Sequence, residues 1–244
     1  MKLHILGCGD AFGSGGRNQS GYLVEATNKL FLLDCGPTTL LAMKRAGFDP
    51  RRLDVIFLSH LHGDHFAGLP FFFIESLYRQ PRTTPLIIAG PPGTEAKVRA
   101  LFQTMYGGAS EDKEIPPTRF VTLQPDEPAN VDGIAVLPFR VTHQSDAISL
   151  ALKVSYEGKQ ILFSGDSLWI DRFIEHAAGV DLFLCECSFY REQPGMHVNY
   201  QALAAHLDRL TCKRLLLTHL GPEMLAHRND LAVAVAEDGM VLEV

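Results

Sequence analysis

The chain has 244 residues, of which 46% are hydrophobic and 20% charged, and its net charge at pH 7 is −6. This length can bury a large core, the charge gives no sign of the basic surface typical of nucleic-acid binders, and no apolar run is long enough to span a bilayer. The five cysteines have no regular spacing, which argues against a disulfide framework and favours a reduced, cytoplasmic protein.

The first half of the chain alternates strand-like runs with helical patterns. Strands are predicted at residues 2–7, 21–26, 29–36, 53–60 and 85–90, and helices at 38–48, 68–80 and 93–106. The first run, "KLHILG", ends at glycines and is typical of a strand rather than a signal peptide. Between Gly107 and Thr118 the polar, Pro/Gly-rich "GGASEDKEIPPT" predicts an exposed loop.

A second group of predicted strands begins at Arg119. Strands are expected at 119–124, 133–143, 148–158, 159–166, 180–187 and 213–221, with helices at 170–179 and 200–210. The tail "LAVAVAEDGMVLEV" predicts two strands joined in a hairpin at Asp238-Gly239. Because each half starts with strands and then mixes in helices, we expect two sheets packed face to face with helices outside, in one domain spanning 1–244.

Titratable side chains recur where the predicted apolar strands end, and strand ends at one edge of a sheet converge in space. The most crowded end is "SHLHGDH", and the full set is His60, His62, Asp64, His65, Asp34, His143, Asp166, Glu186 and His219. Five of the ten histidines belong to this set. Unrelated surface or core histidines would account poorly for that pattern, so these residues are candidates for one shared site.

The H-x-H-x-D-H run indicates metal binding. It supplies imidazole and carboxylate ligands from one turn, which suit zinc, manganese or iron, and Gly63 lets that turn tighten. A pair of metals needs about seven or eight protein contacts. The sequence supplies these, if one carboxylate bridges, from His60, His62, Asp64, His65, His143, Asp166 and His219. The alternative is a histidine-rich polar loop without metal.

The run "HLHGDH", followed in order by His143, the "FSGDS" of Asp166 and the "LTHLG" of His219, resembles the metallo-β-lactamase superfamily over nearly the whole chain. That resemblance implies an α/β fold, the four-layer αββα sandwich with two mixed sheets face to face. It also implies two divalent metal ions, zinc first, with manganese or iron as alternatives. By resemblance, His60, His62 and His143 hold one metal, Asp64, His65 and His219 hold the other, Asp166 bridges them, and Asp34 supports a ligand.

Two further residues resemble the ribonuclease Z branch and its phosphodiesterase relatives. Glu186 in "CECSF" and His197 in "GMHVN" match the acidic residue and the additional histidine of that branch. We expect His197 to act as a general acid on the leaving oxygen, and we count Asp64, His197 and Glu186 as catalytic. The alternatives are a surface histidine and a buried structural carboxylate. The glycine-containing "FGSGGRNQSGYLVE" also resembles that branch, and its Arg17 could meet phosphate.

Departures from the ribonuclease Z pattern favour a compact phosphodiesterase over a tRNA-maturing enzyme. The chain has "DCGPTTL" where that branch has D-C-G-E-G-T-Q, and "HVN" where it has H-S-T. The loop after Gly107 carries three acidic residues and one lysine. An acidic loop repels phosphate, so a tRNA clamp is not expected there.

The sequence therefore predicts a hydrolase that cleaves a phosphodiester, either an RNA end or a small or cyclic ester, with a hydroxide shared by two metals. The alternatives are a thioester, lactone or β-lactam hydrolase on the same fold, a tRNA 3′-processing endoribonuclease, a di-iron redox or nitric-oxide-handling protein, and a nucleic-acid-binding module with a vestigial site. Expected partners are the phosphodiester substrate, with RNA as a candidate, and a second copy through "LPFFFIESLY", but no membrane. The "CEC" cysteines are expected to be core thiols.

Overall fold

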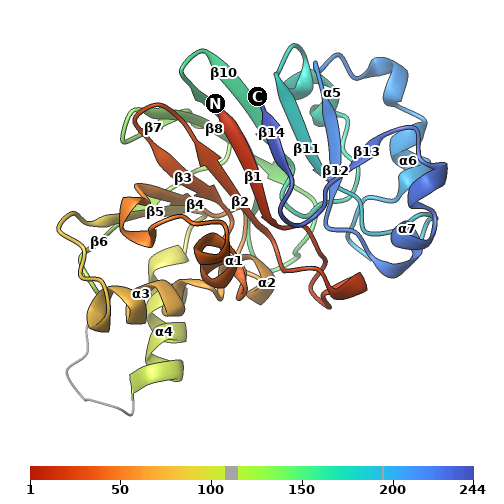
Figure 1. Cartoon of the computed structure of the whole chain (residues 1–244). Coiled ribbons are helices and arrows are strands. Elements are labelled where there is room, and N and C mark those ends of the chain that lie inside the picture. Colours follow the sequence, from red (N-terminus) through yellow and green to blue (C-terminus); the bar gives the residue numbers. More distant parts are fainter. Residues whose placement is uncertain (108–114, 194) are drawn as a thin grey trace.

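The structure is a computed structural model that describes residues 1–107, 115–193 and 195–244. Two seven-stranded sheets lie face to face (Figure 1), which confirms the predicted layering. The first sheet has the order β14 (Val241–Glu243), β1 (Lys2–Gly7), β2 (Gly21–Glu25), β3 (Leu30–Leu33), β4 (Val55–Phe57), β5 (Leu86–Gly90), β6 (Thr118–Thr122). The second has the order β13 (Ala234–Val235), β12 (Leu215–Thr218), β11 (Leu182–Glu186), β10 (Lys159–Phe163), β9 (Ser149–Tyr156), β8 (Ile134–Val141), β7 (Ala129–Val131).

The strands of both sheets alternate between two apolar layers, because successive side chains of a strand point to opposite faces. In β3, Phe31 and Leu33 lie in the core between the sheets, while Leu30 and Leu32 face the helices. Tyr22 of β2 and Phe163 of β10 meet across the central layer with ring centroids 5.2 Å apart. The sequence shows continuous apolar runs here because both faces of each sheet are covered.

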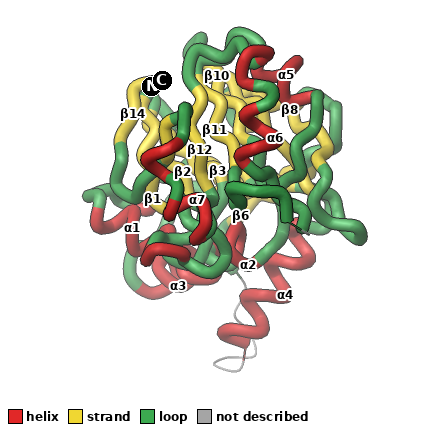
Figure 2. Tube along the Cα trace, turned by 90° about the vertical axis from the view of Figure 1, so that its right-hand side faces the viewer, coloured by secondary structure: helices red, strands yellow, loops and turns green. Residues whose placement is uncertain are grey.

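Helices cover the two outer faces (Figures 1 and 2). On the first sheet they are α1 (Thr39–Arg45), α2 (Gly63–Phe66), α3 (Leu69–Tyr78) and α4 (Thr94–Tyr106), and on the second α5 (Arg172–Ala177), α6 (Tyr200–Ala204) and α7 (Pro222–Ala226). The helix predicted at 200–210 is shorter than expected. It ends after Ala204, and a 3₁₀ turn follows at Leu207–Arg209, next to the His206 ring that stacks flat on Trp169.

Two sequence expectations about the strands were wrong. The strand after Arg119 does not open the second sheet, because β6 pairs in parallel with β5, and the second sheet starts at Ala129. The tail is not a hairpin, because β13 pairs with β12 and β14 pairs with β1 in the other sheet. Asp238 explains the crossing: its carboxylate accepts hydrogen bonds from the backbone N–H of Cys8 (3.0 Å) and Asn18 (2.7 Å), which anchors the turn between the sheets.

Other expectations concern the surface and the cysteines. All five cysteines are free, and Cys185 and Cys187 lie buried between the second sheet and its helices, as predicted for core thiols.

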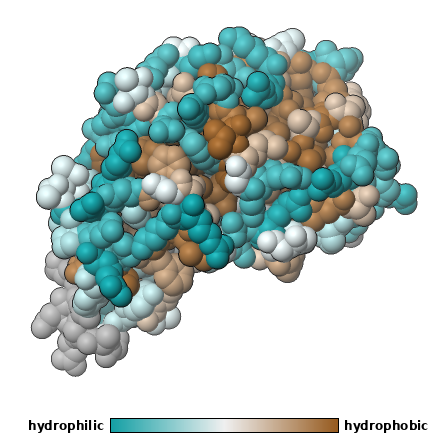
Figure 3. All heavy atoms as spheres, viewed as in Figure 1, coloured by the Kyte–Doolittle hydropathy of each residue, from teal (hydrophilic) through white to brown (hydrophobic). Residues whose placement is uncertain are grey.

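Within the described ranges no helix is long and apolar enough to cross a bilayer. Figure 3 shows apolar surface gathered toward the C-terminal strands, with polar side chains around it. Most of the predicted acidic loop, residues 108–114, lies outside the described residues.

Candidate metal centre and active site

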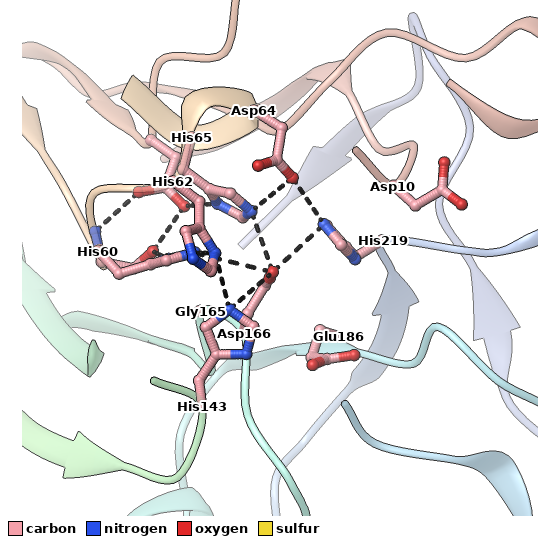
Figure 4. Close-up of polar contacts among 12 residues, drawn as sticks. Asp10, His60, His62, Asp64, His65, His143, Gly165, Asp166, Glu186 and His219 are labelled. Atoms are coloured by element: carbon pink, nitrogen blue, oxygen red, sulfur yellow. Dashed lines mark hydrogen bonds and ion pairs between the residues drawn. The ribbon is translucent and has the colours of Figure 1, made fainter. Parts of the chain in front are cut away.

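The polar strand ends meet at one edge of the two sheets because the strands that carry them run in the same direction. Strands β10, β11 and β12 are mutually parallel, and β8 runs the same way because it is two antiparallel steps from β10. Their carboxyl ends deliver His143, Asp166, Glu186 and His219 to one place. The end of β4 in the first sheet delivers His60 to the same place (Figure 4).

The histidine-rich run forms a tight turn on the first sheet. His62 precedes the one-turn helix α2, which contains Asp64 and His65. The backbone of this helix packs on the segment after β3, where the N–H of Cys35 donates to the carbonyl of His65 (2.7 Å). A Cβ atom on Gly36 would lie 2.4 Å from the carbonyl oxygen of Asp64, so only glycine permits this approach. The "DCG" segment therefore shapes the turn that presents the candidate ligands.

The candidate ligands form two clusters, and the donor atoms of each lie within 4.8 Å of one another. In the first cluster, His62 Nδ1 lies 3.2 Å from His60 Nε2 and 2.9 Å from His143 Nε2. In the second, Asp64 Oδ2 lies 3.1 Å from His65 Nε2 and 3.2 Å from His219 Nε2. The structure thus brings together every residue for which the sequence predicts a metal contact.

Asp166 lies between the two clusters. Its Oδ2 atom is 3.2 Å from His65 Nε2 and 3.4 Å from His219 Nε2, and it is 3.8 Å from the Nε2 atoms of both His60 and His143. Its Oδ1 atom is buried and has no hydrogen-bond partner among the described residues. An unpartnered carboxylate oxygen in the interior is costly, and a cation would satisfy it. This arrangement fits a carboxylate shared by two metals.

In four of the histidines, Nδ1 makes a hydrogen bond to another protein group, which leaves the Nε2 atom of each ring to face the cluster. His65 Nδ1 donates to Asp34 (2.6 Å), His143 Nδ1 donates to the carbonyl of Met196 (3.0 Å), and His219 Nδ1 donates to Ser188 (2.9 Å). His60 Nδ1 lies 3.0 Å from the Ser59 hydroxyl, which donates in turn to Asp34 (2.8 Å). Such support fixes the tautomer that a metal requires.

The electrostatics of the two clusters differ. Burial by itself lowers the pKa of His65, but the charges of Asp166 and Asp34 raise it well above its usual value. Burial and the neighbouring His65 hold the pKa of His60 well below its usual value, so that ring is neutral. For Asp166, burial favours the protonated form, but the charges of His219 and His65 outweigh it and keep its pKa well below normal. The carboxylates that favour a charged His65 would favour a metal cation equally, and neutral imidazole is the form that binds metal.

The predicted acid, His197, lies beside both clusters. Its Nδ1 atom is 2.9 Å from Glu186 Oε1 and 3.9 Å from Asp166 Oδ2, and its ring stacks on His219 with centroids 5.4 Å apart. Glu186 is buried and accepts hydrogen bonds from the N–H of Ser167 (2.8 Å) and from Ser188. Burial lowers the pKa of His197, but the hydrogen bond and charge of Glu186 outweigh this effect and raise it to about 9.

The clusters form the floor of an open pocket of about 390 Å³.

The sequence did not predict the serines that support the ligands. Ser59 lies next to His60 in the sequence, and Ser188 lies two positions after Glu186. The sequence also did not predict the pocket wall that contains Phe12 and Phe189. Arg17, which the sequence suggested for phosphate, does not line this pocket. Its guanidinium lies 3.9 Å from Glu237.

Known proteins of similar sequence and structure bear on this site. The chain is 27% identical to the probable metallo-hydrolase YhfI of Bacillus subtilis, covering 94% of this chain and 90% of that protein. It is 26% identical to ribonuclease Z of Methanosarcina mazei, covering 100% and 98%. The crystal structure of the short form of human tRNase Z aligns with a TM-score of 0.78 at 25% identity, covering 100% of this chain and 99% of the other.

These similarities, together with clusters suited to a metal, show a metal-dependent hydrolase of the metallo-β-lactamase superfamily that is related to ribonuclease Z. A more specific match extends over residues 1–239 of the 244. The chain belongs to the protein family described as anti-Pycsar protein Apyc1.

Proposed function

We propose that this hydrolase is a phosphodiesterase with a dinuclear metal site. Asp166 and the six candidate ligands around it would hold the ions, with zinc as the first choice and manganese or iron as alternatives. When bound, two divalent cations lower the pKa of a shared water and neutralise charge on the group under attack. This chemistry would serve several classes of ester, so the substrate class has to be argued from the remaining residues.

The observation that carries the proposal is the His197–Glu186 pair. Hydrolysis of a phosphodiester releases an alkoxide, which needs a proton as it departs. Glu186 occupies Nδ1 of His197, so Nε2 is the nitrogen that faces the substrate oxygen. The carboxylate also keeps His197 protonated at neutral pH, since it raises the pKa to about 9.

The surrounding backbone positions this pair. The carbonyl of Met196, next to His197, accepts from His143 Nδ1 (3.0 Å), so the loop that carries the acid is tied to a candidate ligand. Ser188 donates to Glu186 (3.2 Å) and accepts from His219 (2.9 Å), which ties the carboxylate to the other cluster. The acid is therefore fixed relative to both clusters, as in-line displacement requires.

The test is hydrolysis of bis(p-nitrophenyl) phosphate by metal-free protein titrated with zinc and then with manganese. We expect turnover to rise to a plateau near two metal ions per chain. A compact phosphodiester or an RNA end would then be the substrate to seek. Metal binding without phosphodiester turnover would contradict the proposal and favour a carboxylic ester, thioester or lactone.

A further inference from the structure

Phe12 is unusual among the apolar residues of the structure. Its side chain is 91% exposed, more than any other large hydrophobic residue in the described ranges, and it lines the mouth of the active-site pocket. Single exposed apolar residues are common on protein surfaces, so exposure alone has no functional meaning. The rigidity of its turn and the composition of the wall around it provide independent reasons to assign Phe12 a role.

The turn that carries Phe12 is held by a buried carboxylate. Asp10 Oδ1 accepts from the backbone N–H of Phe12 (3.2 Å) and of Ser14 (2.9 Å), and Asp10 Oδ2 accepts from the Ser14 hydroxyl (2.7 Å). Gly9, just before this turn, pairs with Leu220, the residue after His219. The backbone that carries the ring is thus fixed to the same strand end as a candidate ligand, so no backbone freedom of this turn is lost when the ring contacts another molecule.

The wall of the pocket contains four apolar side chains besides the polar Asp10 and Ser14 of the Phe12 turn, whereas the floor is polar. Ala11, Phe12, Phe189 and Pro222 line the pocket together with the candidate ligands. The Phe189 ring meets the His197 ring edge to face, with centroids 6.0 Å apart. The leaving group that His197 would protonate would therefore lie on the Phe189 side of the pocket. Phe12 lies on the turn that pairs with Leu220, next to His219, and would face the group that stays on phosphorus.

We propose that Phe12 is a specificity residue that stacks on a planar ring carried by the retained group of the phosphodiester. This inference rests on the proposed phosphodiesterase function and narrows its substrates to esters whose retained group is aromatic or carries a base. Aromatic stacking of this kind changes binding by about tenfold for one ring.

The test compares two esters that share a leaving group. Bis(p-nitrophenyl) phosphate keeps a ring on phosphorus after cleavage, and methyl p-nitrophenyl phosphate keeps a methyl group. In metal-loaded protein we expect Phe12→Ala to lower kcat/KM for the first ester about tenfold and for the second less than about twofold. Measured by calorimetry, the affinity of the Phe12→Ala variant for p-nitrophenyl phosphate should be lower than that of the wild type by a similar factor. The affinity of the variant for methyl phosphate should equal that of the wild type.

Matched variants separate stacking from other effects. Phe12→Tyr keeps the ring and should retain wild-type values, and Phe71→Ala, which removes a half-buried ring on α3 outside this pocket, should change neither ester. Equal losses on both esters, or no loss on either, would overturn the assignment. So would a change in oligomeric state of Phe12→Ala, since the ring would then belong to a contact between copies. If wild-type protein cleaves neither ester, the proposed function itself fails and this inference falls with it.

Discussion

The floor and the wall of the pocket are built in different ways. The floor consists of buried side chains at strand ends, and the second nitrogen of each of His60, His65, His143 and His219 is held by another protein group. The wall comes from the segments around Phe12 and Phe189 and from the start of α7 at Pro222, and its Phe12 ring is almost fully exposed. The candidate ligands therefore depend on the sheets, whereas the proposed specificity residue lies on a connecting segment, where side chains vary more readily than in strands.

Loss of the Asp166 carboxylate should have the largest effect, because Asp166 lies between both clusters. We expect Asp166→Asn to abolish detectable turnover and to lower the metal content below two ions per chain, measured by elemental analysis. Asp171→Asn removes an exposed carboxylate that does not line the pocket and should leave both properties unchanged. A fully active, metal-replete Asp166→Asn protein would show that the two clusters do not share this ligand.

Removal of His197, the proposed general acid, should affect turnover but not metal content. His197→Ala should lower kcat about 10²–10⁴-fold for an ester with an alkoxide leaving group, the usual effect of losing a general acid. The loss should be smaller with p-nitrophenolate, which departs without a proton. Steady-state kinetics on both types of ester, together with elemental analysis, provide the check. An equal loss on both, or loss of metal, would instead make His197 a ligand or a structural residue.

A smaller effect is expected from changing Asp34, which makes a hydrogen bond to the candidate ligand His65. Asp34→Asn keeps a side chain that tolerates the left-handed backbone at this position (φ 58°) but removes the charge beside His65. Zinc affinity should fall about 10–100-fold, the usual result of losing such a partner. Competition with a chromophoric chelator measures this. Unchanged affinity would mean that His65 is oriented by packing alone.

The smallest effect is expected at the turn between the sheets. Asp238→Ala removes the acceptor for two backbone N–H groups next to the Asp10 turn and should lower the free energy of unfolding by about 1 kcal/mol. Urea denaturation measures the difference, with Asp208→Ala, on an exposed 3₁₀ turn, as the matched control. Metal affinity should stay at the wild-type value, and a loss there would show that the turn also supports the floor.

The sequence predicted the floor well and the wall poorly, for a physical reason. His219 follows an apolar strand directly and His60 and Asp166 lie three positions after theirs, so the strand pattern locates them, and parallel strands bring them together. Phe12 and Phe189 lie in turns whose positions depend on contacts distant in the sequence, the pairing of Gly9 with Leu220 and the hydrogen bond from Ser188 to the carbonyl of His219. The hairpin prediction failed for a similar reason: Asp-Gly is a local turn signal, but the partners of Asp238 lie more than 200 residues away.

The division of the ligands between the sheets has a consequence for folding. His60, His62, Asp64 and His65 follow a strand of the first sheet, while His143, Asp166 and His219 follow strands of the second. A bound ion would therefore act as a non-covalent crosslink between the two halves of the sandwich. By mass action, an ion present at 100 times its dissociation constant adds about 2.7 kcal/mol to the folded state. Metal supply would then contribute to the stability of the folded chain as well as to its activity.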